Sequence, residues 1–150
     1  MLVNLEIVTD VQNIIRRDFT LADKQDVNPT NPNCIIDGEF VSLTLDYKIT
    51  RSLVGGLGFA VWAEKGRFDV QAIGKLTVLF AGPYEADTRI FTPAGLTLGG
   101  PLSISASVDG PPTGTTRSGL IASPGGIVLG YVTRMPANNG GKLRFLKTFG

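Results

Sequence analysis

Hydrophobic and polar residues alternate with a period of two through several parts of the chain. The clearest runs are residues 41–50, from Val-Ser-Leu-Thr to Lys-Ile-Thr, and residues 102–108. Successive side chains of a β-strand point to opposite faces, so this pattern predicts strands with one buried face. Further strands are expected at residues 3–8, 57–62, 68–80, 88–91, 127–134 and 142–148.

Glycine and proline separate these candidate strands. Glycine and proline are typical of tight turns. They occur between the candidate strands at residues 82–83, 99–101, 109–112, 124–126 and 138–141. Many short strands at close spacing, with little helical pattern, predict an all-β fold. We expect a small β-barrel or β-tulip-like domain with an extended N-terminal arm.

The first thirty residues lack the clear strand pattern of the rest of the chain. A short helix is expected from Asp10, which would cap it, to Phe19, and the polar residues 20–33 contain two prolines. One interpretation is an arm and linker at 1–30 that leaves a barrel domain at 31–150. The other is an ordinary first strand followed by a long loop.

A second polar segment, Asp-Gly-Pro-Pro-Thr-Gly-Thr-Thr-Arg-Ser at residues 109–118, has few apolar side chains to bury. Such composition predicts an exposed, mobile loop.

Charged residues make up 18% of the 150 positions, against roughly 25% in an average soluble domain. The mean hydropathy is +0.17. A chain with so few charges has difficulty covering an isolated surface, which favours burial against other chains and a homo-oligomer. The net charge of +1 gives no overall field for nucleic acid, and the uncharged stretches are too short to cross a bilayer. The lone Cys34 excludes an internal disulfide and favours a reducing compartment.

The charges are unevenly distributed along the chain. Residues 1–109 carry nine basic and thirteen acidic side chains, whereas residues 110–150 carry five basic and no acidic ones. The last strands would then either lie beside acidic neighbours in the same barrel or present a basic face to an acidic partner. The five basic residues are Arg117, Arg134, Lys142, Arg144 and Lys147.

Residues that support catalysis or metal binding are scarce. The chain has no histidine and one cysteine, so no Ser-His or Cys-His pair and no imidazole ligand exists. We therefore expect no catalytic site, no metal and no cofactor. Trp62 is expected in the core, with a partner or sugar contact as the alternative. Turn or surface positions are expected for the carboxylate pairs Asp23/Asp26, Asp37/Glu39 and Glu85/Asp87.

The C-terminal half resembles a known family. Four segments carry the similarity, in this order: residues 81–91, the turn and strand at 98–104, the tripeptide 118–120 and the glycine-rich strand 125–133. Together they resemble the decoration or cement proteins of tailed-phage capsids. The similarity covers roughly residues 80–150. The chain departs from the shortest family members in its long first half, and glycine stands before Pro101 where the family often has an acidic residue.

The resemblance implies a structural virion protein, made in the host cytoplasm, that binds the outer surface of an expanded capsid. It implies the major capsid protein as partner, a dimer or trimer on the shell, and no enzymatic activity. Two alternatives remain: another virion component of the tail, neck or fibre, and a ligand- or carbohydrate-binding β module. The candidate partner-interface residues are Arg16, Arg17, Phe19, Arg117, Arg134 and Arg144.

Overall fold

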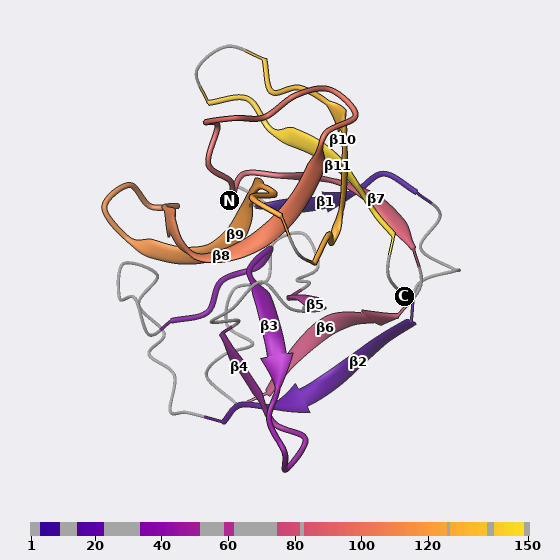
Figure 1. Ribbon diagram of the computed structural model, residues 1–150. Coiled ribbons are helices and arrows are strands. Elements are labelled where there is room, and N and C mark those ends of the chain that lie inside the picture. Colours follow the sequence, from indigo (N-terminus) through magenta and orange to yellow (C-terminus); the bar gives the residue numbers. More distant parts are fainter. Residues whose placement is uncertain are drawn as a thin grey trace.

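The computed structural model describes residues 4–9, 15–22, 34–51, 59–61, 75–81, 83–125, 127–137 and 140–148. All regular structure in these ranges is β, arranged as two antiparallel sheets (Figure 1). The six-stranded sheet contains, in spatial order, β1 (Leu5–Ile7), β7 (Tyr84–Thr88), β11 (Leu143–Lys147), β10 (Gly130–Arg134), β8 (Pro101–Asp109) and β9 (Thr116–Ala122). The five-stranded sheet contains β2 (Ile15–Thr20), β6 (Lys75–Ala81), β5 (Phe59–Val61), β3 (Phe40–Leu43) and β4 (Ile49–Arg51).

Each sheet curls, and a residue that follows a strand on one side forms a bridge with the outer strand on the other side. In the six-stranded sheet, Phe91 follows β7 and forms a parallel bridge with Leu120 of β9. In the five-stranded sheet, Leu21 follows β2 and bridges Ile49 of β4 in the same way. Closure of this kind pairs backbone groups that an open edge would leave exposed. The fold is therefore all-β and barrel-like, as the alternation predicted.

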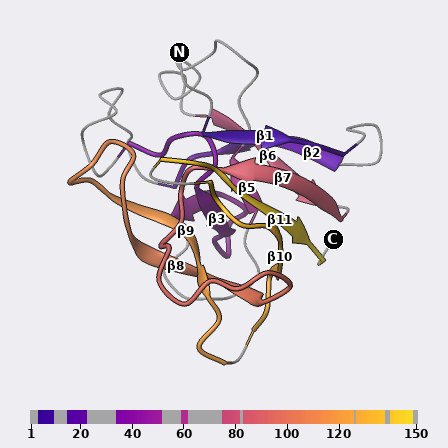
Figure 2. The same cartoon turned by 90° about the horizontal axis from the view of Figure 1, so that it is seen from above.

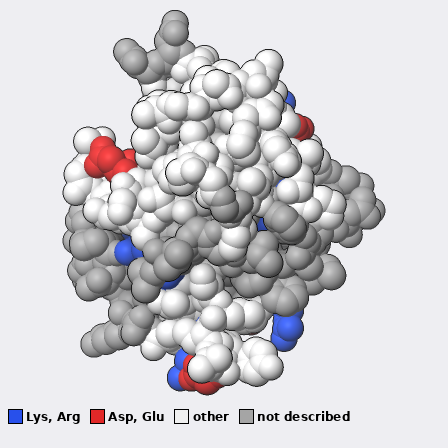
Figure 3. Space-filling view, in the orientation of Figure 1, with Lys and Arg blue, Asp and Glu red and all other residues white. Residues whose placement is uncertain are grey.

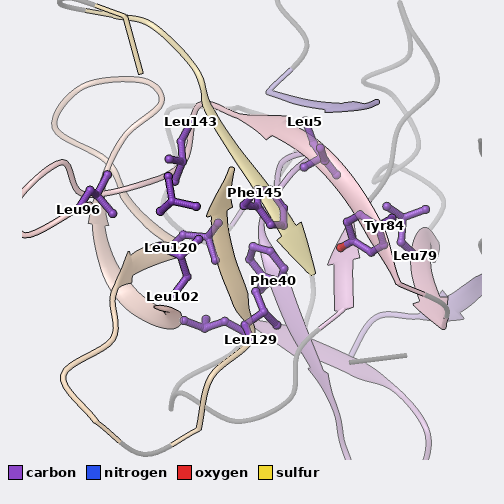
Figure 4. Close-up of a cluster of buried hydrophobic side chains, with 13 residues drawn as sticks. Leu5, Phe40, Leu79, Tyr84, Leu96, Leu102, Leu120, Leu129, Leu143 and Phe145 are labelled. Atoms are coloured by element: carbon purple, nitrogen blue, oxygen red, sulfur yellow. The ribbon is translucent and has the colours of Figure 1, made fainter. Parts of the chain in front are cut away.

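The main core lies inside the six-stranded sheet and receives side chains from the five-stranded one (Figure 4). Leu143 and Phe145 alternate with Arg144 and point inward, as the period of two requires. Phe145 makes edge contacts with the rings of Phe40 and Tyr84, both at 6.2 Å between centroids. Phe40 belongs to β3, so this aromatic cluster joins the two sheets.

The alternating run at 41–50 is two strands and a turn, and the single predicted strand is wrong. β3 ends at Leu43 and β4 begins at Ile49, with Val41 opposite Arg51. Leu45 and Tyr47, expected on the buried face, are 104% and 77% exposed. A hydrogen-bonded turn therefore interrupts a pattern that reads as continuous.

The segment before Thr88 also differs from its expectation. Glu85 and Asp87 are expected at turn or surface positions, but Tyr84–Thr88 form β7, which pairs with β1 on one side and β11 on the other (Figure 2). The expected strand at 88–91 contributes only its first residue. Tyr84 and Ala86 are buried in the core, so the central position of β7 follows from tertiary packing.

The loop between β8 and β9 is shorter than predicted. β9 begins at Thr116, and both Thr115 and Gly110 are buried. Asp109 Oδ1 accepts a hydrogen bond from the Gly114 amide at 2.9 Å, and the Gly110 amide donates to the Thr115 carbonyl. The tip at 112–114 is exposed, as are Asp109 and Thr116 at the ends of the flanking strands.

The described parts of residues 1–30 are built into the two sheets. β1 pairs with β7 and β2 pairs with β6, so both segments have strands of the two sheets as neighbours. The helix expected from Asp10 to Phe19 is wrong where it overlaps β2. Residues 10–14 and 23–33, with Asp23 and Asp26, lie outside the described residues, as does Trp62.

Candidate functional site

Glu39, Arg51 and Arg117 form a buried ion cluster between the two sheets. Glu39 precedes β3, Arg51 ends β4, and Arg117 lies in β9. The side chains of Glu39 and Arg117 are fully buried, and that of Arg51 is 18% exposed. We call these three residues the Glu39 cluster.

The carboxylate of Glu39 is saturated with donors. Its Oε1 lies 2.9 Å from Arg51 Nε and accepts the Ser118 amide at 3.0 Å. Its Oε2 accepts the Ile36 amide at 2.8 Å and lies 3.5 Å from Arg117 Nη1. A buried charge is tolerated only when such partners replace its hydration.

The two arginines are held on their other sides by backbone carbonyls. Both donate to the Cys34 carbonyl oxygen, and Arg117 Nε also donates to the Pro111 carbonyl at 2.9 Å. Burial lowers the pKa of Arg117, while the Glu39 carboxylate acts in the opposite direction. The cluster connects the two sheets. Both carboxylate oxygens of Glu39 already have protein partners, so neither is left to contact a substrate.

Asp37 makes a second buried connection, at the turn that Gly38 forms with φ of 87°. Its Oδ2 accepts the Asn4 amide at 2.8 Å, and its Oδ1 accepts Asn4 Nδ2 at 3.0 Å. Burial raises the pKa of Asp37, partly offset by these hydrogen bonds. The predicted turn is correct, but Asp37 and Glu39 are buried, where they hold parts of the fold together, and do not lie on the surface.

The outer face of the six-stranded sheet carries a row of charged residues. The row contains one residue from each of four adjacent strands, and each residue lies directly opposite the next in the strand pairing. The residues are Glu6 on β1, Asp87 on β7, Arg144 on β11 and Arg134 on β10. Arg144 Nε donates to Asp87 Oδ1 at 2.8 Å, and Arg134 Nη2 donates to Asp87 Oδ2 at 3.3 Å. The Arg144 hydrogen bond is the main cause that lowers the pKa of Asp87. We call these four residues the charged row.

Glu6, at one end of the charged row, also pairs with Lys142 Nζ at 3.0 Å. Four of the five basic residues of the last forty-one therefore contact acidic residues of the first 109. This confirms that basic residues of the last strands lie beside acidic neighbours in the same barrel.

A second, largely apolar row lies next to the charged row on the same face. Leu146 is the register neighbour of Glu85 on one side and Tyr131 on the other, and Tyr131 neighbours Pro101. Val8 donates its amide to the Glu85 carbonyl and continues the row onto the β1 side. Val8, Tyr131 and Leu146 are 41%, 42% and 36% exposed. We call these five residues the apolar row.

Lys147 is the fifth basic residue and points into the core. It is 2% exposed, and its Nζ lies 5.7 Å from the centroid of the Tyr84 ring. Burial lowers the pKa of Lys147 to about 8. The same burial raises the pKa of Tyr84 far above its ordinary value.

Besides the outer face of the six-stranded sheet, the turn between β3 and β4 presents distinctive exposed residues. We call residues 44–48 the hairpin tip. Thr44 Oγ1 contacts Asp46 Oδ1 at 2.5 Å and accepts the Lys48 amide at 3.1 Å, and Asp46 pairs with Lys48 at 3.5 Å. Leu45 and Tyr47 extend from this frame into solvent. Tyr47 has φ of 60°, a conformation that costs a bulky residue roughly 1 kcal/mol.

The candidate interface residues fall into three places. Arg134 and Arg144 lie together in the charged row. Arg117 belongs to the buried Glu39 cluster, so its side chain does not reach the surface of this chain. Arg17 is exposed on β2, with its guanidinium 5.3 Å from the centroid of the buried Phe19 ring. Arg16 also lies on β2 and is the register neighbour of Leu79.

Sequence reasoning missed the Glu39 cluster and the hairpin tip. The cluster joins residues 78 positions apart, and no local pattern reports such a contact. The tip has a weak local signal, since Thr44 and Asp46 are turn-forming residues within the strand pattern.

Within the described ranges, no three His, Cys, Asp or Glu side chains gather as metal ligands. No helix long and apolar enough to cross a membrane occurs in the same part of the chain. The chain matches no protein-family model, no curated protein and no solved structure.

Proposed function

We propose that this protein is a structural, non-catalytic component of a tailed-phage virion that binds the outside of the expanded capsid. The observation that carries the proposal is that the residues similar to decoration proteins form a connected unit. They supply β7 and parts of β8, β9 and β10. Strands β10, β8 and β9 are neighbours in the six-stranded sheet, and Phe91, which follows β7, bridges Leu120 of β9. The major capsid protein is the proposed partner, and the outer capsid surface is the proposed location.

The distribution of charge supports an adhesive role. The acidic groups of the Glu39 cluster and the charged row are paired with arginine or lysine side chains of the same chain. Residues other than Lys, Arg, Asp and Glu make up most of the described surface in the view of Figure 3. Such a surface gains free energy when another protein covers it.

The hairpin tip is the proposed anchor to the shell. It lies at the bottom of Figure 1, at the end of the five-stranded sheet away from the six-stranded one. A large aromatic side chain on a rigid frame loses little conformational entropy on binding, which is typical of interface hot spots. Tyr47 and Leu45 would enter an apolar pocket of the capsid, with the Asp46–Lys48 pair at the rim.

Binding of this kind stabilises a capsid through linkage. A protein that binds the expanded lattice more tightly than the precursor lattice shifts the equilibrium towards the expanded form. If one molecule or oligomer spans several capsid subunits, weak contacts combine into high avidity.

The test mixes the purified protein with expanded and unexpanded shells and measures the bound fraction by co-sedimentation. We expect saturable binding to expanded shells only. The double substitution L45S/Y47S should weaken this binding about thirtyfold, the effect of losing a hot spot of ~2 kcal/mol.

The matched control is Leu98→Ser, since Leu98 is also a strongly exposed apolar residue, at 69%, but lies outside the tip. Its affinity should equal that of the wild type. Equal binding to both shell forms would reject the proposed function, whereas an unaffected L45S/Y47S variant would reject only the proposed anchor.

A further inference from the structure

The outer face of the six-stranded sheet has a charge order that is complementary to itself. Along the charged row, the acidic Glu6 and Asp87 occupy β1 and β7, and the basic Arg144 and Arg134 occupy β11 and β10. One half of the row is therefore negative and the other half positive. The two ends are the exposed members, with side-chain exposures of 64% for Glu6 and 56% for Arg134.

We propose that two copies of this chain associate through this face, with a two-fold axis parallel to the strands and between β7 and β11. Rotation about this axis reverses the strand order, so β1 of one copy faces β10 of the other. Glu6 then lies opposite Arg134 of the second copy, and Asp87 lies opposite Arg144. The inference does not depend on capsid binding.

The neighbouring apolar row fits the same axis. Because the rotation keeps each position along the strands, the apolar row faces the apolar row of the second copy. Val8 lies opposite Tyr131, and Leu146 covers the half-buried Glu85. An axis perpendicular to the strands would instead place the whole charged row over the apolar row and remove the reciprocal ion pairs, whereas the parallel axis covers only one charged group, Glu85, with an apolar side chain.

The pairing leaves the contacts within each chain intact. Glu6 keeps Lys142 at 3.0 Å, and a carboxylate has room for a second cation. Arg134 contacts Asp87 through one guanidinium nitrogen and keeps its other donors. Reciprocal ion pairs of this kind determine orientation and partner choice more than raw affinity.

Charge reversal tests the arrangement. Sedimentation velocity over a concentration series should show a reversible dimer for the wild type. Each single variant, Glu6→Arg or Arg134→Glu, places like charges together twice per dimer and should raise the dissociation constant about tenfold or more. The double variant exchanges the charges and should restore association.

The matched control is Lys75→Glu, a charge reversal at an exposed position of β6 in the other sheet, which should leave the dissociation constant unchanged. A wild-type protein that stays monomeric at every concentration would overturn the proposal. Equal association of all variants would also overturn it, because the dimer would then use another face.

Cross-linking gives an independent measurement of the orientation. In this arrangement a cysteine at position 6 lies across from position 134 of the second copy. Two copies of position 6 are further apart, by three strand spacings of about 4.8 Å within the plane. A short bismaleimide should therefore couple a mixture of Glu6→Cys and Arg134→Cys proteins more efficiently than either protein by itself, and equal coupling would contradict the axis.

Discussion

The Glu39 cluster and the charged row use the same chemistry in opposite environments. Each has one carboxylate between two arginines: Glu39 with Arg51 and Arg117, and Asp87 with Arg134 and Arg144. The first lies between the sheets, and the second lies on the outer face of one sheet. An interior ion pair cannot be opened without leaving a charge in an apolar medium, whereas a surface pair exchanges its partner for water.

The comparison separates architecture from recognition. The Glu39 cluster has no exposed carboxylate and joins β3, β4 and β9, so it holds the fold. In the charged row the Asp87 carboxylate is only 11% exposed, but Glu6 and Arg134 are 64% and 56% exposed; we expect these partly solvated pairs to contribute less to stability, and the exposed ends are available to another chain. Burial decides which role an ion pair has.

The largest predicted effect comes from Glu39→Gln. The neutral amide leaves the buried Arg117 without its counterion, and the free energy of unfolding should fall by about 3–5 kcal/mol. Glu6→Gln is the matched change in a surface pair and should cost at most ~1 kcal/mol. Urea denaturation of both variants measures the difference. Similar losses in the two variants would mean that burial does not separate the two sites.

Lys147→Met should raise the free energy of unfolding by about 1–2 kcal/mol at pH 7, because it removes a buried cation that has no acidic partner among the described residues. The pKa of Lys147 is lowered to about 8 in the folded protein, against 10.5 ordinarily. The unfolded chain therefore binds more protons between these values, and wild-type stability should rise relative to K147M as the pH increases from about 8 to 10.5. A difference that does not change across this interval would contradict the buried cation.

Asp87→Asn should cost about 1 kcal/mol at neutral pH, less than Glu39→Gln, since the charged row is partly solvated. The pKa of Asp87 is lowered in the folded state, mainly by its hydrogen bond with Arg144. Its contribution is present above the ordinary value of 3.8 and is lost as the pH falls through the folded pKa. Thermal unfolding of wild type and D87N should converge in acid. A gap that widens there would reverse the assigned shift.

Tyr47→Asn should have the smallest effect on stability. Asparagine accepts the positive φ of this position more readily than tyrosine, so the free energy of unfolding should stay unchanged or rise by about 0.5 kcal/mol. Shell binding should nevertheless fall, which separates recognition from stability at one residue. A destabilised variant would show that Tyr47 packs against the fold.

The alternation predicted the class of fold because burial of one sheet face is a local property of sequence. It identified β8, β10 and β11 closely, since each begins after a glycine- or proline-containing turn. It failed at residues 41–50 because exposed Leu45 and Tyr47 occupy the apolar phase of the pattern. β7 was missed because Glu85 and Asp87 look like loop residues until the arginines of neighbouring strands are in place.

The site residues were less predictable than the strands. Excess positive charge after residue 109 was visible in the sequence, but which carboxylate each arginine contacts depends on strand order. Arg117 is the clearest case: it follows a polar loop, yet closure of the two sheets buries it against Glu39. Such contacts depend on how strands distant in the sequence pair with one another, and the hydrophobic pattern of one segment carries no information about that pairing.

The most direct test of the proposed role is a comparison of virions made with and without this protein by cryo-electron microscopy. The account predicts difference density on the outside of the expanded shell, with the hairpin tip directed at the capsid subunits. Identical outer surfaces in the two samples would contradict it.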